Sequence, residues 1–399
     1  MKFALVSIAL PPAWGGQAVV LYHLLKEMNP DEYCLITQKN YHFYSMHGEC
    51  APSLKARYHF LGPDYQANRR VIMGVAGALH LNAVLEWFLS FRTRQIVKIV
   101  REEGCDAIVA CTGDLFDPPA AYRASLILGI PFYLYAFDKY SQADKSPEVY
   151  SFTEKYEPEL LRGAAGVIVP NEFMYSDYLE KYTITSTIIH NPSDLRKAGN
   201  TDRDEEPQPE GEKKIVYTGA IYAAHFDAFR DLIEAIRSLN RDDIKVHLYT
   251  TQSQSNLEAE GICGPVVYHK HQPLSVMSEI QESADVLFLP LAFNSAYPEV
   301  IRTSAPGKTG DYLASGRPIL VHAPADSFVS WYFKEHNCGI VVDQKDPAAL
   351  ASALNTILSD KDLQTRLGEA ARACALRDFN PKRAREVFSE LIRSPGRKG

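Results

Sequence analysis

The chain has 399 residues, 46% of them hydrophobic. This length predicts more than one domain, because single domains seldom exceed about 250–300 residues. Lys and Arg number 42 and Asp and Glu number 49, and the formal charge of −7 gives no general reason to expect nucleic acid as a partner. Seven cysteines occur without a CxxC pair, which argues against a disulfide framework and a structural zinc site and favours a reducing cytoplasm.

The N-terminal segment reads as the opening of a βαβ unit rather than as a signal peptide. An apolar run at 3–10 is followed by Gly15 and Gly16, and then by apolar residues with helical spacing from 21 to 28. The longest apolar stretch, 71–89, is interrupted by polar residues and is a poor candidate for a membrane span. We therefore expect a soluble protein.

Short apolar runs bounded by glycine or proline recur along the rest of the chain. They cover 107–111, 131–136 and 166–170 in the first half, and 214–219, 245–249, 285–290, 318–322 and 339–343 in the second. Strands that are apolar on both faces are typical of parallel sheets covered by helices. The expected fold class is therefore α/β, with two doubly wound, Rossmann-like domains.

The two series of strands are separated by a polar segment, 195–214, that is rich in charged residues and predicts a loop. We expect a first domain over 1–192 and a second over 193–378. A C-terminal helix within 379–399 is left without an assigned partner, and packing back on the first domain is one option. Ligands of such folds bind at the carboxyl ends of the strands, so functional residues are expected in a cleft between the two sheets.

The first glycine pair is a candidate anion site. Gly15 and Gly16 lie between Trp14 and Gln17, where a strand ends and a helix begins, and free backbone N–H groups at such a position attract anions. A plain tight turn is the alternative. The GxGxxG fingerprint is absent, which argues against a nicotinamide or flavin enzyme.

A stronger constellation lies between residues 298 and 320. Pro306 and Gly307 predict a turn, Lys308 stands at a helix start, and Asp311 follows one turn later on the same face. A cation beside free N–H groups suits a diphosphate, and a carboxylate beside it suits the hydroxyls of a ribose. An ordinary ion pair on a surface helix is the alternative.

The stretch from Pro306 to Pro318 resembles the donor-binding motif of family-4 glycosyltransferases with the GT-B fold. Further stretches match that family in order: 11–16, 166–173, 188–194, 283–290 and 339–343. The resemblance covers nearly the whole chain. It implies transfer of a sugar from a nucleotide-sugar, with a UDP-sugar favoured, to a hydroxyl acceptor with retention at the anomeric carbon, and with no required metal or cofactor.

The resemblance also assigns roles to residues. Asp311 would hold the ribose, Lys308 with Thr309 and Gly310 the diphosphate, and Gly15 and Gly16 the phosphate or the sugar. The rest of the implied donor site consists of Gly219, Arg302, Tyr268, His269 and Lys270. Tyr268 is expected to end a strand, and His269 and Lys270 are expected in the loop that follows it. On the acceptor side we place Trp14, Gln17, Tyr41, His42 and Tyr140.

Three departures from the family pattern leave the donor and the activity open. The glutamate expected eight residues before the ribose carboxylate is Thr303, and the ribose residue itself is an aspartate. The basic pair expected after the first strand of the second domain is missing, and Arg302 is the likeliest substitute for its charge. Asp138 stands where a histidine is commoner. The base for the acceptor is left open between Asp138, Asp114 and the donor phosphate.

The functional hypothesis is a cytoplasmic, retaining glycosyltransferase in polysaccharide, glycolipid or glycoside biosynthesis, with no nucleic-acid partner. A basic, aromatic-bearing segment over 68–101 would allow peripheral contact with an anionic membrane and a lipid-linked acceptor, or is an ordinary solvated helix face. The alternatives are a nucleotide-sugar epimerase or hydrolase of the same fold, a catalytically degenerate nucleotide-binding partner subunit, and an extracytoplasmic two-lobed binding protein. The last would require the signal peptide that we argue against.

Overall fold

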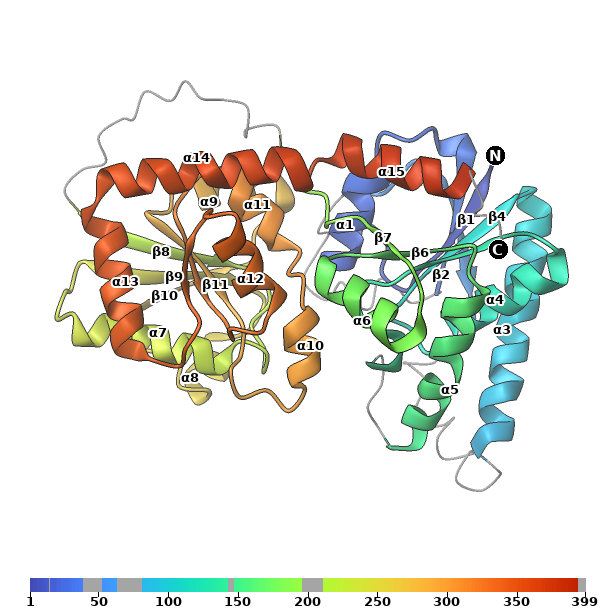
Figure 1. The fold of residues 1–399 in the computed structure, drawn as a ribbon, viewed down its shortest axis with the longest axis horizontal. Coiled ribbons are helices and arrows are strands. Elements are labelled where there is room, and N and C mark those ends of the chain that lie inside the picture. The colour runs from blue at the N-terminus through green and yellow to red at the C-terminus, as the bar shows by residue number, and fades with distance from the viewer. Residues whose placement is uncertain (14, 39–51, 63–80, 143–146, 196–210, 394–399) are drawn as a thin grey trace. The chain divides into compact units, whose positions relative to one another are not determined.

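The computed structural model describes residues 1–13, 15–38, 52–62, 81–142, 147–195 and 211–393 (Figure 1). The chain divides into two compact units. The first contains Met1–His190 and Lys382–Gly399, and the second contains Asn191–Pro381. The division after residue 190 lies two residues before the expected boundary.

The first unit is built on a seven-stranded sheet in which all the described pairs are parallel. The strand order is β3-β2-β1-β4-β5-β6-β7. The strands are β1 (Phe3–Val6), β2 (Tyr33–Gln38), β3 (Arg57–Leu61), β4 (Ala107–Cys111), β5 (Phe132–Tyr135), β6 (Gly166–Val169) and β7 (Thr187–Ile188). The central strands are buried on both faces, as their unbroken apolar runs predict.

Helices cover both faces of this sheet. They are α1 (Gly16–Leu25), α3 (Leu81–Glu103), α4 (Asp117–Leu128), α5 (Pro147–Gly163), α6 (Glu172–Tyr182) and α15 (Pro381–Arg393). Alternate residues of β1 point to opposite faces of the sheet and belong to two separate hydrophobic cores. Ala4 belongs to the core under α3, α4 and α5, and Phe3 to the core under α1 and α15.

The C-terminal helix α15 packs on the first unit. Its Phe388 meets Phe3 with ring centroids 5.5 Å apart, and the Tyr133 hydroxyl donates to the Ile392 carbonyl over 3.1 Å. This buried face holds the end of the chain against the first strand.

The second unit has a six-stranded sheet of the same kind, with the order β10-β9-β8-β11-β12-β13. The strands are β8 (Lys213–Thr218), β9 (Ile244–Thr250), β10 (Val266–Lys270), β11 (Val286–Pro290), β12 (Ile319–His322) and β13 (Ile340–Val342). The helices are α7 (Phe226–Ser238), α8 (Gln254–Ala259), α9 (Leu274–Glu282), α10 (Pro298–Thr303), α11 (Lys308–Ser315), α12 (Phe328–Glu335), α13 (Pro347–Ser359) and α14 (Lys361–Asp378).

Both sheets reverse their strand order once, between β1 and β4 in the first unit and between β8 and β11 in the second. The doubly wound α/β class expected from the sequence is therefore confirmed. In open sheets of this kind the carboxyl ends of the strands at the reversal are where ligands bind. Among the residues described here, no helix is both long and apolar enough to cross a membrane.

The helix α14 lies directly against the C-terminal end of α11 (Figure 1). A Cβ atom added at Gly368 would lie 2.3 Å from the carbonyl oxygen of Gly316, the residue that ends α11 with a φ of +66°. This contact requires glycine at position 368, because backbone atoms cannot move aside as a flexible side chain can.

We expect Gly368→Ala to lower the free energy of unfolding of the second unit by about 1–3 kcal/mol, the usual cost of overpacking. Differential scanning calorimetry measures this as a lower melting temperature. The control is Gly62→Ala, since a Cβ there has no neighbour within 4 Å. Equal melting temperatures for the two variants would contradict the close approach of α14 to α11.

Candidate active site

The candidate site in the second unit begins at the carboxyl end of β8, where the sheet reverses. Gly219 follows this strand with a φ of +119°, a conformation that favours glycine. A Cβ at this position would lie 3.2 Å from Nζ of Lys308. The missing side chain therefore lets a lysine from α11 reach the end of the central strand, and the structure brings together two residues that the sequence analysis predicted for the donor site.

Lys308 is the first residue of α11, and its ammonium is held by an aromatic ring. Nζ donates to the Tyr217 hydroxyl over 2.5 Å and lies 3.8 Å from the centroid of the same ring. The Tyr217 hydroxyl in turn donates a hydrogen bond to the Ala220 carbonyl, 2.6 Å away. Burial lowers the pKa of Lys308 to about 7.

No carboxylate pairs with Lys308 in the part of the chain that the structure describes. A cation removed from water and left without an opposite charge costs free energy, and such groups concentrate at functional sites. An anionic ligand would supply the missing charge.

His225 lies beside this lysine. It is the residue before α7, it is buried, and its ring meets that of Tyr217 with the centroids 6.0 Å apart. Burial and the Lys308 ammonium together hold the pKa of His225 well below its usual range, so the imidazole is neutral at neutral pH. Its buried Nδ1 has no hydrogen-bond partner among the described residues. A neutral imidazole with an unused nitrogen beside a cation suits a phosphate or a sugar hydroxyl.

The loop after β11 is fixed to the same place by Asp227. Its carboxylate accepts from the backbone N–H groups of Phe293, at 3.0 Å, and Asn294, at 2.8 Å. The backbone N–H of Ala292 donates to the Ala224 carbonyl over 2.7 Å. The two loops that flank the strand-order reversal are therefore tied to each other.

Asp311 lies one turn after Lys308, and the segment that enters the second unit holds its carboxylate. Burial raises the pKa of Asp311 to about 7, and the neighbouring Asp194 backbone N–H and Ser193 hydroxyl act in the opposite direction. Asp311 and Asp194 line a pocket of about 280 Å³ between α9 and α11.

The start of α11 is fixed from the same side. Asn191 Nδ2 donates to the Ala305 carbonyl over 3.0 Å, and a Cβ at Gly310 would lie 2.1 Å from Ser193 Oγ. No side chain caps α11, and the buried Thr309 Oγ1 has no partner among the described residues. The first turn of α11 thus keeps N–H and hydroxyl donors for a ligand.

Two residues of α10 bear on the departures from the family pattern. Arg302 is half-buried in the last turn of this helix. Thr303 is buried, and its hydroxyl donates to the Glu299 carbonyl of its own helix over 3.2 Å. The side chain that stands where the resemblance expects a glutamate therefore makes a bond within its own helix.

The strand β10 is longer than the sequence predicted, so Tyr268, His269 and Lys270 lie in it rather than at its end and in a loop. The reason is continued pairing with β9 up to Lys270 and Thr250. The Tyr268 hydroxyl donates to the Ile262 carbonyl, and the His269 ring stacks on Tyr249 with the centroids 4.2 Å apart. The expectation of a loop after residue 268 was wrong, and of these three side chains Lys270 is the exposed one.

In the first unit, Gly15 and Gly16 stand at the start of α1. Gly15 has a φ of +126°, Gly16 is the first helical residue, and no side chain caps the helix. Gln17 points inward, because its amide nitrogen donates to Ser7 Oγ over 3.0 Å and to the Thr112 carbonyl over 3.1 Å. Its side chain is therefore used to join β1 to β4. Trp14, Tyr41 and His42 lie outside the described residues.

The other predicted residues of the first unit differ in exposure. Asp114 is 1% exposed, and its carboxylate accepts from the backbone N–H groups of Phe116 and Asp117 and from Gln38 Nε2, at 2.7–2.8 Å. Tyr140 is buried, and its hydroxyl donates to the Leu115 carbonyl. Asp138 is exposed. Of the two aspartates, Asp138 is therefore the more accessible.

Sequence reasoning missed Tyr217 and Ser193. Tyr217 follows two apolar residues of its strand and reads as core with them, so nothing in the pattern shows that its ring faces a lysine 91 positions away. Ser193 lies in a stretch that the resemblance marks only as the crossing between domains, and its contact with Gly310 and Asp311 depends on the tertiary fold.

The environment of Lys308 predicts a stability effect. The pKa of this lysine falls from 10.5 in the unfolded chain to about 7 in the folded one, so the folded protein binds fewer protons between these two values. The positive charge therefore destabilises the fold fully below pH 7. This destabilisation decreases as the pH rises to about 10. We expect ligand-free Lys308→Met to melt at a higher temperature than the wild type at pH 6, with the difference shrinking by pH 9.

Differential scanning fluorimetry across this pH range checks the effect. Lys345→Met, at an exposed lysine of the same unit, is the matched control and should follow the wild type at every pH. A melting temperature of Lys308→Met at or below that of the wild type at pH 6 would show that this ammonium is compensated in solution.

Comparisons with known proteins give a family match in the second unit. Residues 212–360 match the profile of the family described as "Glycosyl transferases group 1". A search of curated proteins found no match for the chain. The match therefore covers the central part of the second unit, from β8 to the end of α13.

Solved structures are similar over the full length. One is a glycosyltransferase from Rickettsia africae, with 12% identity and a TM-score of 0.69 over 100% of this chain and 99% of that one. Anabaena HepE, crystallised with UDP and glucose, has 14% identity and a TM-score of 0.65 over 99% of this chain and 100% of that one. Sucrose-phosphate synthase from Thermosynechococcus elongatus has 16% identity and a TM-score of 0.68 over 98% of both chains. The chain has the GT-B fold of two Rossmann-like units, and its segment 212–360 is similar to the group 1 glycosyltransferases.

Proposed function

We propose that this protein is a retaining glycosyltransferase that moves a sugar from a nucleotide-sugar, a UDP-sugar, to a hydroxyl of a saccharide, lipid-linked or small-molecule acceptor. The observation that carries the proposal is the ammonium of Lys308, which lies at the carboxyl end of β8 beside a neutral imidazole and has no carboxylate partner among the described residues. The group 1 profile of the same segment and the UDP and glucose bound by Anabaena HepE support it.

The main electrostatic demand of such a transfer is the charge that develops on the departing diphosphate. The Lys308 ammonium would stabilise this negative charge. Moving the ammonium toward the diphosphate would cost little free energy, because its present hydrogen-bond partner is a neutral hydroxyl. His225 and Arg302 would take the place of the missing basic pair. The uncapped first turn of α11, with Thr309, would add N–H and hydroxyl donors.

Asp311 would accept the ribose hydroxyls. The turn that carries it is fixed by the close packing of Ser193 on Gly310, so little conformational entropy of the backbone remains to be lost on binding. The pocket of about 280 Å³ that Asp311 lines is close to the lower end of small-molecule sites, which start near about 300 Å³.

Retention in this proposal requires no carboxylate nucleophile. Placement of the acceptor and stabilisation of the leaving group would lower most of the barrier, with no metal or cofactor needed. Asp138, which is exposed after β5, or the donor phosphate itself would take the acceptor proton. Gly15, Gly16 and the uncapped start of α1 would serve the sugar or its phosphate.

Thr303 favours one alternative, a catalytically degenerate partner subunit. The resemblance expects a glutamate at this position, whereas the threonine hydroxyl bonds to its own helix. Such a subunit would bind the nucleotide without turnover. A nucleotide-sugar epimerase or hydrolase of the same fold is the other alternative.

The donor assignment is tested by thermal shift with UDP, GDP, ADP, dTDP and CDP. A nucleotide present at about 100 times its dissociation constant adds roughly 2.7 kcal/mol of stability. We expect a response to UDP that Lys308→Met and Asp311→Asn abolish and that Lys345→Met keeps. Because Lys308→Met is expected to be more stable without ligand, its lost response cannot reflect unfolding. No response of the wild type to any nucleotide would overturn the donor site.

The reaction is tested by incubating the protein with UDP-sugars alone and with a panel of acceptors, and by measuring released UDP. An α-linked product from an α-linked donor, read by proton NMR, is expected for retention, and an inverted product contradicts it. Free sugar without acceptor identifies the hydrolase alternative, and binding without turnover identifies the degenerate subunit.

The outer face of α3 supports a lipid-linked acceptor. Trp87, Phe91, Arg94, Lys98 and Arg101 recur at spacings of four and three, which places them on one stripe of the helix. Trp87 is 65% exposed, and it stacks on Phe91. We name this set the α3 stripe.

The α3 stripe continues onto α4 through a groove of about 490 Å³, lined by Arg94, Val97, Lys98, Arg101, Glu102 and Ile127. Leu126 and Ile127 of α4 are 61% and 60% exposed. Three cations and one carboxylate around exposed apolar side chains suit the headgroups of an anionic membrane. Arg92, which the sequence analysis counted with this basic segment, is buried instead and pairs with Asp117 at 3.3 Å.

We expect the protein to cosediment with vesicles that contain phosphatidylglycerol and not with phosphatidylcholine alone. Arg94→Gln with Lys98→Gln should weaken binding by about 1 kcal/mol for each charge removed, roughly thirtyfold together. Leu376→Ser, at an exposed leucine of α14, is the control. Equal binding to both kinds of vesicle, or no effect of the double substitution, would contradict the α3 stripe as a membrane surface.

A further inference from the structure

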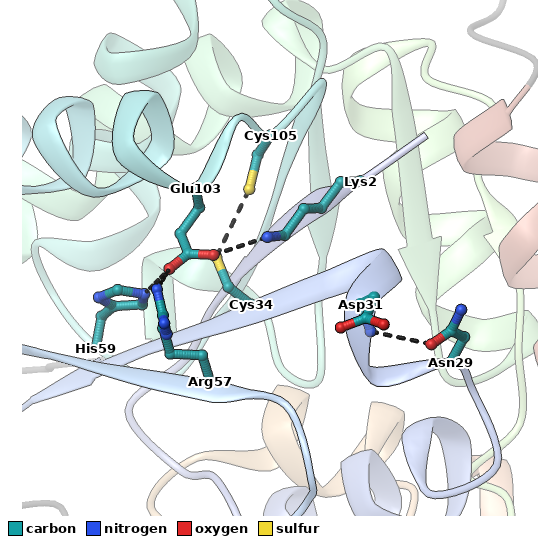
Figure 2. Close-up of polar contacts among 8 residues, drawn as sticks. All are labelled: Lys2, Asn29, Asp31, Cys34, Arg57, His59, Glu103 and Cys105. Atoms are coloured by element: carbon teal, nitrogen blue, oxygen red, sulfur yellow. Dashed lines mark hydrogen bonds and ion pairs between the residues drawn. The ribbon is translucent and has the colours of Figure 1, made fainter.

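We propose that Cys34, His59 and Glu103, with Cys105 as the nearest fourth donor, bind one divalent transition-metal ion, of which zinc fits the ligands best. Figure 2 shows these side chains pointing toward one another from three elements of the first unit. Cys34 lies in β2, His59 in β3, and Glu103 is the last residue of α3. The proposal is independent of the sugar transfer proposed above.

The donor atoms are already close. One ligand atom from each of Cys34, His59 and Glu103 lies within 4.8 Å of the other two. His59 Nε2 is 2.8 Å from Glu103 Oε1, and the sulfur atoms of Cys34 and Cys105 are 3.6 Å apart. Cys105 stands two residues beyond Glu103, so the same short turn carries two of the donors.

These separations suit a tetrahedral ion. Zinc bonds of about 2.0–2.3 Å place neighbouring ligand atoms roughly 3.3–3.8 Å apart. The two sulfur atoms already have this spacing, and the imidazole and carboxylate need to separate by about half an ångström from their hydrogen bond. Thiolate, imidazole and carboxylate together are ligands that zinc accepts.

The ligands have other partners before the ion binds. Lys2 and Arg57 contact the Glu103 carboxylate at 2.7 and 3.0 Å, so a bound ion would share this carboxylate with two neighbouring cations. The Cys34 and Cys105 sulfur atoms are hydrogen-bonded to each other, so at least one of them carries a proton. Binding would exchange thiol protons for the ion, so the total charge of the buried cluster would stay nearly constant.

The location indicates a structural role. Cys34 is near the amino end of β2, Glu103 ends α3, and Cys105 precedes β4, so the ion would join β2, β3 and the α3–β4 turn. Ligands of such sheets bind at the opposite, carboxyl ends of the strands. We therefore expect the ion to raise stability and to leave sugar transfer unchanged.

Co²⁺ serves as the probe, because its thiolate bond gives a charge-transfer band in the near ultraviolet. We expect reduced, metal-free wild type to bind one equivalent of Co²⁺ with that band, to lose it when Zn²⁺ is added, and to melt at a higher temperature with either ion. Binding should weaken as the pH falls, since protons compete for the thiolates and the imidazole.

Cys34→Ser and His59→Gln should abolish the band. His59 is partly exposed, with 19% of its side chain accessible, so the second variant is expected to fold even if the first does not. Cys338→Ser with Cys374→Ser, at a buried cysteine pair of the second unit, is the matched control and should keep it. The proposal is overturned if the wild type shows no thiolate band with Co²⁺, or if His59→Gln binds Co²⁺ as tightly as the wild type.

Discussion

The candidate site of the second unit is organised around the ammonium of Lys308, which no carboxylate among the described residues neutralises. Lys308 reaches the end of β8 because position 219 has no side chain, and it rests on the ring of Tyr217 with a hydroxyl as its hydrogen-bond partner. A charge in this setting is costly without a counterion, and the fold retains it at the place where doubly wound sheets bind their ligands. The neutral His225 beside Lys308 and the unused donors of α11 are likewise groups that a ligand at this place would complete.

The surrounding contacts keep that charge in position. Asp227 ties the loop after β11 to the start of α7, while Asn191 and Ser193 hold the turn that precedes α11 and its first residues. These are part-buried hydrogen bonds to backbone groups and a close contact at Gly310. They fix the helix start before any ligand arrives, which is a form of preorganisation.

Much of the architecture could be predicted from the sequence because buried parallel strands are short, apolar on both faces and bounded by glycine or proline. The run at 107–111 coincides with β4, and the helix expected after Pro381 is α15. The end of β10 was harder to predict. Tyr268, His269 and Lys270 are polar or half-exposed, and no apolar pattern marks this part of the edge strand. The pairing of Lys308 with Tyr217, the inward turn of Gln17 and the burial of Arg92 arise from tertiary packing, so spacing along the chain gives no sign of them. The same holds for Cys34 and Cys105, which meet across 71 positions.

The packing of α15 makes the first unit discontinuous in the chain: residues 1–190 are completed by a helix that begins after the whole second unit. During synthesis the second unit has all of its residues available before the first does, because Phe388 and Ile392 follow the whole second unit in the chain. Until then the face of β1 that carries Phe3 and Leu5 lacks part of its cover. Apolar surface exposed in this way is what molecular chaperones bind, so the nascent first unit depends on protection for longer than a contiguous domain of its size would.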